Sequence, residues 1–176
     1  MSNESIKLKY IILDTSALLA KYQLLYYSND VVLMTTPLVV SEVKDHESRG
    51  ALDLAVSLGK LLIVEPQEAL ISKARDFVQS IGENYSISPT DLSVIALALQ
   101  LKDRLKRGEV VVVITDDYSI QNTLLNAGVA FKPLRTRGIR IPRKYFVICP
   151  TCNYASTNIL EKTCPLCNTP LIKLSS

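Results

Sequence analysis

The sequence contains no hydrophobic run long enough to cross a membrane. Its longest nearly apolar stretch, residues 92–101, is interrupted by Ser93 and Gln100 and is about half of the roughly 20 residues that a transmembrane helix needs. The segment before Asp14 lacks the apolar region of a secretory signal, and 4 cysteines in 176 residues do not make a disulfide scaffold. We therefore expect a cytoplasmic protein without a membrane partner.

The sequence contains one histidine and no glycine-rich phosphate-binding loop. This reduces the number of catalytic mechanisms that the protein could use. The single histidine, His46, lies in the charged stretch 44–47, which favours a solvent-exposed position; the weaker alternative is a supporting role beside Glu42, four residues earlier on the same helix face. Neither an independently supported Ser-His-Asp set nor a phosphate-binding glycine loop is present. An enzyme of this composition would most economically use a carboxylate-held metal ion on a phosphate ester.

Residues 1–131 alternate short β-branched runs with helical stretches, the pattern of an α/β layer fold with a central parallel sheet. We expect strands at residues 10–13, 31–34, 61–64, 110–114 and 129–131. We expect helices that open near Thr15, near Pro37, after Pro66 and near Tyr118, and one at residues 89–107. The last of these is apolar on most faces between residues 92 and 101, so it should be buried.

Five carboxylates follow strand ends or lie near helix starts. Asp14 follows the first strand, Asp116 and Asp117 follow the strand at 110–114, Glu42 lies one turn into the second helix, and Asp91 lies in the first turn of the buried helix. The carboxyl ends of parallel strands meet at one edge of a sheet, where ligand sites gather. Clustered carboxylates stay ionised when a cation holds them, and oxygen ligands select Mg²⁺ or Mn²⁺.

Each of these acids also has a purely structural interpretation. Asp14 and Asp117 are placed to cap helices. Residues 88–91 have the outline of a capping box, and Glu42 fits a solvated helix charge. For any single acid both interpretations stay open, and only the joint placement favours a metal site.

Four cysteines form two Cys-x-x-Cys pairs with eleven residues between them: Cys149, Cys152, Cys164 and Cys167. Two such knuckles supply a tetrahedral set of four sulfurs, which one structural Zn²⁺ prefers and which leaves no open position for catalysis. A redox pair or two disulfides are the less favoured alternatives. Residues 145–176 are therefore expected to fold as a small zinc ribbon that depends on its metal.

Residues 132–144, the basic linker, join the two regions and carry six cations with no acid: Lys132, Arg135, Arg137, Arg140, Arg143 and Lys144. Two prolines and a glycine predict an extended, weakly structured segment. The net charge of +3 hides this segregation, because residues 1–131 hold 12 cations against 16 anions. The basic linker is the candidate RNA-binding segment, with a merely solvated linker as the alternative.

The acidic motifs, taken in order, resemble those of the PIN-domain ribonucleases: Leu13-Asp14-Thr15-Ser16-Ala17, Glu42, Ser88-Pro-Thr-Asp91-Leu-Ser-Val-Ile-Ala, and Thr115-Asp116-Asp117-Tyr118. The resemblance spans residues 10–131. The segment at residues 115–122 and the four cysteines make the resemblance more specific, because together they resemble the archaeal Nin-one-binding (NOB) endonuclease family. It implies a three-layer PIN-like domain at 1–131, a basic linker at 132–144 and a zinc ribbon at 145–176.

The resemblance also implies an activity and a ligand set. The activity is metal-dependent maturation of the 3′ end of small-subunit (16S/18S-type) rRNA precursor, on the pre-small ribosomal subunit, with a KH-domain assembly factor as a further candidate partner. One or two Mg²⁺ or Mn²⁺ ions would bind Asp14, Glu42, Asp91 and Asp117, with Asp116 as an auxiliary acid. The alternatives are a general or toxin-like PIN ribonuclease and a non-catalytic RNA-binding assembly factor.

The resemblance leaves two smaller groups of residues with open roles. Ser16 and Thr115 are candidates for contacts that support the acids or the phosphate. Tyr145, Phe146 and Tyr154 could stack on unpaired bases, although packing inside the ribbon is the favoured interpretation.

Overall fold

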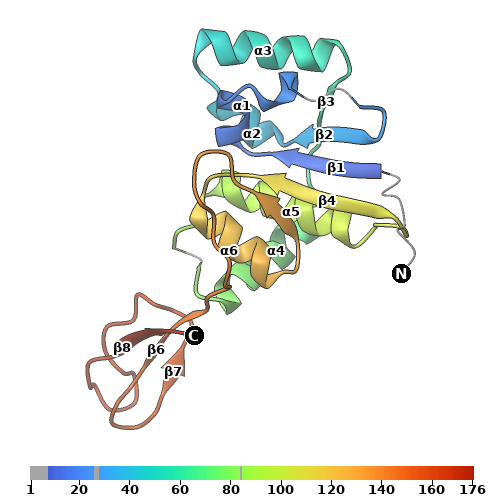
Figure 1. Cartoon of the computed structure of the whole chain (residues 1–176). Coiled ribbons are helices and arrows are strands. Elements are labelled where there is room, and N and C mark those ends of the chain that lie inside the picture. Colours follow the sequence, from blue (N-terminus) through green and yellow to red (C-terminus); the bar gives the residue numbers. More distant parts are fainter. Residues whose placement is uncertain (1–7, 26–27, 84) are drawn as a thin grey trace.

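Five parallel strands form the central sheet in the computed structural model, which describes residues 8–25, 28–83 and 85–176 (Figure 1). The strands are β1 (Leu8–Leu13), β2 (Val31–Thr35), β3 (Leu61–Ile63), β4 (Glu109–Ile114) and β5 (Ala130–Lys132). Their order across the sheet is β3-β2-β1-β4-β5. This arrangement confirms the predicted α/β fold with a central parallel sheet. The first seven residues, on which part of the expectation about secretion rests, lie outside the described residues.

Helices cover both faces of the sheet and complete three layers (Figure 1). They are α1 (Thr15–Leu19), the 3-10 turn η1 (Tyr22–Leu24), α2 (Pro37–Glu42), α3 (His46–Ser57), α4 (Glu68–Ser80), α5 (Pro89–Lys102) and α6 (Tyr118–Asn126). Right-handed crossovers place α1 and α3 on one face and α4, α5 and α6 on the other, while α2 lies at the carboxyl edge of the sheet and contacts α5. Within the described part of the chain, no helix has the length and apolar character of a membrane span.

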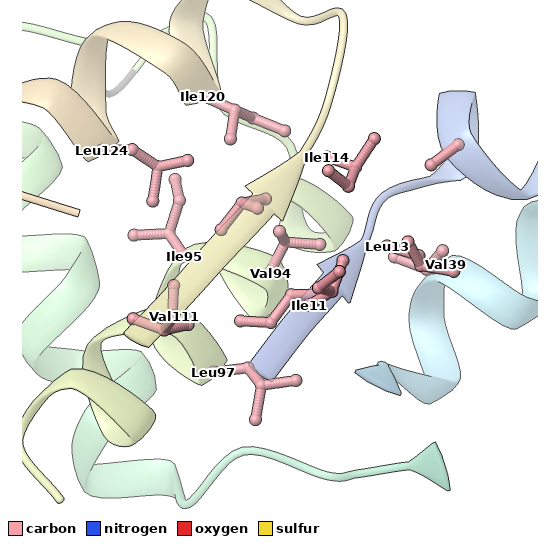
Figure 2. Packing of buried hydrophobic residues seen from close by; sticks show 14 of the residues in the cluster. Ile11, Leu13, Val39, Val94, Ile95, Leu97, Val111, Ile114, Ile120 and Leu124 are labelled. Atoms are coloured by element: carbon pink, nitrogen blue, oxygen red, sulfur yellow. The ribbon is translucent and has the colours of Figure 1, made fainter. Parts of the chain in front are cut away.

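The core is centred on α5 and the two middle strands. Ile95 and Leu97 of α5 are fully buried, as are Leu13 of β1 and Ile114 of β4, and Figure 2 shows these side chains packed together. Burying one such aliphatic side chain stabilises the fold by about 1.5–3 kcal/mol. The expectation of a buried helix is confirmed, because α5 is enclosed on nearly every face.

Two expected helices end earlier than predicted. The helix from Pro37 stops at Glu42, because Val43 takes up an extended backbone and Asp45 caps a new helix by accepting a hydrogen bond from the Ser48 amide at 2.8 Å. His46 therefore begins α3 and shares no helix face with Glu42, so that part of the prediction is wrong, although His46 is exposed as expected.

The buried helix is also shorter than the sequence pattern indicates. It ends at Lys102 rather than at residue 107, because Asp103 caps it and the chain then turns into β4. Gly108, with a φ of 86°, supplies the left-handed backbone of that turn.

Beyond β5 the basic linker leads to a small antiparallel sheet, the ribbon (Figure 1). Its strands are β6 (Tyr145–Ile148), β7 (Ala155–Ser156) and β8 (Ile172–Ser175), in the order β7-β6-β8. Residues 133–144 form neither helix nor strand, as predicted, but their backbone is hydrogen-bonded to the sheet-and-helix part of the chain, the body.

Candidate active site

The chain adds strands in one direction from β1 and in the opposite direction from β4. The first acid lies at this switch point between the two strands. These two strands are neighbours in register, with Leu13 opposite Ile114, while the chain winds to β2 and β3 on one side and to β5 on the other. Asp14 and Thr115 follow directly, and the Thr115 hydroxyl donates to Asp14 Oδ2 at 2.7 Å. Ligands of open parallel sheets bind at such switch points.

Glu42 reaches the same place from the last residue of α2. The Thr36 side chain caps α2 and hydrogen-bonds the Ser93 hydroxyl at 2.7 Å, which ties α2 to α5. The Thr15 hydroxyl then donates to Glu42 Oε2 at 2.6 Å. Since Thr15 follows Asp14 in the chain, this bond brings Glu42 to the first turn of α1 beside Asp14.

Asp91 and Asp117 each cap a helix and still face the same region. Asp91 Oδ2 accepts from the Ser88 amide at 2.8 Å in a complete capping box, and Asp117 Oδ1 accepts from the Ser119 and Ile120 amides at 2.7 and 2.9 Å. Asp91 Oδ1 and Asp117 Oδ2 accept no hydrogen bond from another described residue. Capping and ligand binding are therefore compatible, because each acid uses one oxygen as a cap.

The charges of these four acids, the acid cluster, act on one another. Burial raises the pKa of Asp14, and the charges of Asp91 and Asp117 add to that rise against the lowering effect of its hydrogen bonds. Burial likewise raises the pKa of Asp91, with Asp117 and Glu42 contributing. The neighbouring charges thus make the Asp14 and Asp91 carboxyls harder to ionise, a cost that a bound cation removes.

The acid cluster fits a hard divalent cation that keeps some of its water. All of its donors are carboxylate oxygens, the ligands of Mg²⁺ and Mn²⁺. Among the described residues, the four cysteines are the one group of three or more His, Cys, Asp or Glu whose ligand atoms all lie within 4.8 Å of one another. The carboxylates are spaced more widely than that, which suits an ion shared between a few carboxylates, water and a phosphate.

Asp116, the fifth predicted acid, is directed away from the acid cluster. Its Oδ1 accepts hydrogen bonds from the amides of Leu134, Arg135 and Thr136 at 2.8–3.2 Å. Its slight burial would raise the pKa of Asp116, but these backbone donors outweigh that effect and lower it. The structure therefore brings Asp14, Glu42, Asp91 and Asp117 together and uses Asp116 to hold the basic linker.

Two buried amides that the sequence analysis did not single out also hold the basic linker. Gln121 Oε1 accepts from the Ile139 amide at 3.1 Å, and Asn122 accepts from the Arg143 amide at 2.7 Å and donates to the Arg143 carbonyl at 2.9 Å. Both amides are at most 3% exposed. The only sequence signal for them is their place in the phrase at residues 115–122, where polar residues interrupt a helix that faces the core.

The two supporting hydroxyls lie where the resemblance puts them. Thr115 contacts Asp14, and it also accepts a hydrogen bond from the Asp117 amide at 3.1 Å. The Ser16 hydroxyl lies 3.4 Å from Asp14 Oδ2 and accepts from the Asp116 amide at 3.2 Å. These bonds fix the orientation of Asp14 before any ligand binds.

The six cations of the basic linker are exposed: Lys132, Arg135, Arg137, Arg140, Arg143 and Lys144. None of them forms an ion pair with another described residue. Lys132 is part of β5, so the basic linker begins within the sheet. Hydrogen bonds to the body hold the backbone of the basic linker. Its cationic side chains therefore extend from fixed backbone positions without an ion-pair partner among the described residues.

The four cysteine sulfurs of the ribbon form a compact group. Cys149 and Cys167 Sγ are 3.4 Å apart, as are those of Cys152 and Cys164, far beyond the ~2.05 Å of a disulfide. Four sulfurs at about 2.3 Å from one ion lie roughly 3.8 Å apart, so the group fits a tetrahedral metal site. The residue after each knuckle, Asn153 and Asn168, takes up a left-handed backbone with φ of 59° and 57° that closes the turn.

The aromatic residues of the ribbon are partly enclosed. Tyr145 and Phe146 are half-buried in β6, and the Tyr154 hydroxyl donates to Glu161 Oε2 at 3.0 Å. These contacts favour packing in the ribbon over base stacking for Phe146 and Tyr154.

Comparisons with known proteins agree with this geometry. A family model described as the PIN domain of ribonuclease matches residues 11–101. The chain is 35% identical over 143 residues to Endoribonuclease Nob1 of Pyrococcus abyssi, covering 81% of this chain and 83% of that protein. It is 36% identical over 128 residues to Ribonuclease VapC3 of Aeropyrum pernix, covering 73% and 88%. It is 32% identical over 107 residues to the 20S-pre-rRNA D-site endonuclease NOB1 of Saccharomyces cerevisiae, covering 61% and 23%.

Proposed function

The chain belongs to the Nob1 family of PIN-domain endoribonucleases, and on that premise we propose that it cuts small-subunit rRNA precursor to form the mature 3′ end. The observation that carries this proposal is the convergence of four acids from four separate segments at the switch point of the family's sheet. The yeast relative is named for cleavage of 20S pre-rRNA, which supports the substrate. A pre-ribosomal substrate implies a protein of the cytoplasm.

The acid cluster would hold one or two Mg²⁺ or Mn²⁺ ions through Asp14, Glu42, Asp91 and Asp117. Such an ion, when bound, lowers the pKa of a coordinated water and neutralises charge on the phosphate. The chain's own residues orient the ligands: Thr115 and the Thr15 amide fix both oxygens of Asp14 at 2.7 Å. This arrangement needs no histidine base, in keeping with the exposed His46.

The ribbon and the basic linker would supply affinity. One Zn²⁺ on the four cysteines stabilises the ribbon, which has only two fully buried cysteines and Val147 as its interior. The cations of the basic linker offset the repulsion between the acid cluster and RNA phosphates. A KH-domain assembly factor stays a predicted partner, which co-purification with the pre-small ribosomal subunit tests.

A general or toxin-like PIN ribonuclease is the second candidate, favoured by the similarity to the Aeropyrum ribonuclease. The non-catalytic alternative has less support, because a scaffold would have no use for four converging acids whose charges raise the pKa of Asp14 and Asp91. A comparison of two RNAs distinguishes these functions: a transcript that spans the rRNA 3′ junction and the same nucleotides in scrambled order, each titrated with Mn²⁺. Equal cutting of both RNAs supports the general ribonuclease, and no Mn²⁺-dependent cutting supports the scaffold.

A further inference from the structure

A cleft of about 690 Å³ opens between the body, the basic linker and the ribbon. The body contributes Tyr118 and Ser119 of α6 together with the loop around Gly82, the linker contributes residues 138–143, and the ribbon contributes residues of β6 and β8. The volume lies within the roughly 300–1,000 Å³ of ligand-binding pockets. Tyr118 directly follows Asp117, so the cleft begins one residue from the acid cluster.

The walls of this linker cleft are fixed to one another. The Tyr145 amide of β6 donates to the Ile81 carbonyl at 2.9 Å. Gly82 has a φ of 75°, and a Cβ on it would lie 2.2 Å from the Tyr145 carbonyl oxygen, so only glycine permits this close approach. Asn122 holds the other end of the linker at Arg143. The cleft is therefore a built feature and not a gap beside a loose tether.

Positive charge dominates the surface of the linker cleft. Arg140 and Arg143 from the linker and Lys173 from the ribbon line it, and all three are exposed. Among the described residues of its lining, the one acid is Glu83, which is 4% exposed. Its carboxyl group accepts from Asn122 Nδ2 at 2.7 Å and from the Ser86 hydroxyl at 2.8 Å, so both of its oxygens have hydrogen-bond partners inside the protein.

Apolar surface lies beside these cations. The Tyr118 ring is 53% exposed and Ile141 is 75% exposed, and both line the cleft. An exposed aromatic ring beside exposed cations is the combination that binds unpaired nucleotides, through stacking of the base and pairing of the phosphate. The α6 amide groups of Ser119 and Ile120 do not contribute, because Asp117 already occupies them.

We propose that the linker cleft binds the unpaired RNA nucleotides next to the bond that is cut. Bases lie against Tyr118 and Ile141, and phosphates pair with Arg140, Arg143 and Lys173. This inference rests on the proposed function. It explains how an acidic site retains an RNA strand, because cations held in the cleft beside the acid cluster compensate for the repulsion between its carboxylates and the RNA phosphates. It also restricts the substrate to unpaired nucleotides, because only an unpaired base is free to stack on Tyr118.

To test whether the linker cleft binds RNA, RNA binding and RNA cleavage are measured separately. Binding uses a short junction RNA without Mn²⁺ over a range of salt concentrations, and cleavage uses the same RNA with Mn²⁺. The variants are Tyr118→Ala, its rescue Tyr118→Phe, and the double variant Arg140→Glu/Arg143→Glu. The matched control is Arg104→Glu/Lys106→Glu, which changes the charge equally at exposed cations outside the cleft.

Tyr118→Ala should raise the Kd roughly tenfold, as loss of one stacked base does, and Tyr118→Phe should restore it. The Arg140/Arg143 variant should bind RNA more weakly. In a plot of log Kd against the logarithm of the salt concentration, its slope should be lower by about 1.4, the value for two lost phosphate contacts of a single strand. The control should match the wild type, and annealing a complement to the flanking nucleotides should weaken wild-type binding.

Wild-type affinity and salt slope in both cleft variants would overturn the linker cleft as an RNA site, whatever the cleavage assay shows. Absence of Mn²⁺-dependent cleavage by the wild type would instead contradict the proposed function. The two failures are therefore distinguishable, since the first is measured by Kd and the second by product.

Discussion

At the scale of single residues, three of the four acids of the cluster also serve as helix caps. Asp14, Asp91 and Asp117 each accept a backbone amide near a helix start with one oxygen, which stabilises the helix by about 0.5–2 kcal/mol. In Asp91 and Asp117 the cap fixes the side chain and orients its other oxygen for a cation, whereas the second oxygen of Asp14 is held by the Thr115 hydroxyl. The structural interpretation of these three residues is thus confirmed, and the proposed metal-binding role uses the same side chains.

Asp14→Asn should abolish cleavage and stabilise the protein in the absence of Mg²⁺ and Mn²⁺. The folded-state pKa of Asp14 is raised above its ordinary 3.8, so its ionised form costs stability at neutral pH. The variant should gain about 0.5–2 kcal/mol in its free energy of unfolding. This gain should shrink as the pH falls through the raised pKa toward 3.8, because the wild type and the variant are then both neutral at position 14. Thermal unfolding against pH, with zinc retained, measures it; a variant less stable than the wild type at pH 7 would contradict the expectation.

Asp116 and Asp117 are neighbours whose loss should have different effects. Asp117→Asn should lower kcat by roughly 10³-fold, because it removes a charge from the acid cluster. Asp116→Asn should leave kcat within about threefold and mainly raise KM, since its carboxylate holds residues 134–136 of the basic linker. Steady-state cleavage of one junction RNA by the two variants decides, and equal losses of kcat would show that both acids serve the chemistry.

At the scale of elements, α6 is the part that joins the site to the rest of the molecule. Its cap Asp117 belongs to the acid cluster, while Gln121 and Asn122 on its buried side hold the linker backbone. One helix of nine residues therefore fixes the position of one acid of the cluster and of the cationic segment together.

Asn122→Ala should loosen the end of the basic linker. The change removes both hydrogen bonds to the Arg143 backbone and leaves the buried Glu83 without one donor, a cost of about 2–4 kcal/mol. Hydrogen exchange at the Arg143 amide should accelerate, while exchange at Leu134, which Asp116 holds, should change little. Unchanged protection at Arg143 would mean that other contacts fix the linker.

The elements differed in how far the sequence could predict them. Strands β1 and β4 and the buried helix α5 are marked by runs of apolar residues with few polar interruptions, and these runs are recognisable from the local sequence. The break between α2 and α3 is not marked, because polar residues continue through it and only Asp45 as a cap decides the end. Gln121 and Asn122 were also beyond prediction, since their partners are backbone groups about 20 residues away. The acids could be proposed as a set from their positions after strands and near helix starts, whereas the turn of Asp116 toward the linker depends on the tertiary fold.

At the scale of the whole molecule, two cores of different origin are joined by hydrogen bonds. The body has a large aliphatic core around α5, whereas the ribbon relies on four sulfurs at mutual distances that fit one metal ion. The Tyr145 amide and the Ile81 carbonyl connect the two at 2.9 Å. The linker cleft lies at this junction and depends on both parts.

Removal of zinc by a chelator should unfold the ribbon and leave the body folded. The protein should release one zinc per chain, keep most of its helical circular dichroism and lose RNA affinity, because the ribbon wall of the linker cleft is lost. Metal analysis and circular dichroism before and after chelation measure this. Collapse of the helical signal would show that the body also depends on the metal, and more than one zinc per chain would contradict the single four-sulfur site.

The central claim is that the acid cluster cuts small-subunit rRNA precursor at one place. The most direct measurement is to incubate a precursor transcript with wild-type protein and with Asp14→Asn, with and without Mn²⁺, and to map every new 3′ end. We expect one new end, at the mature 3′ terminus, formed only by the wild type with Mn²⁺. Scattered ends, cutting that is independent of Mn²⁺, or equal cutting by Asp14→Asn would contradict it.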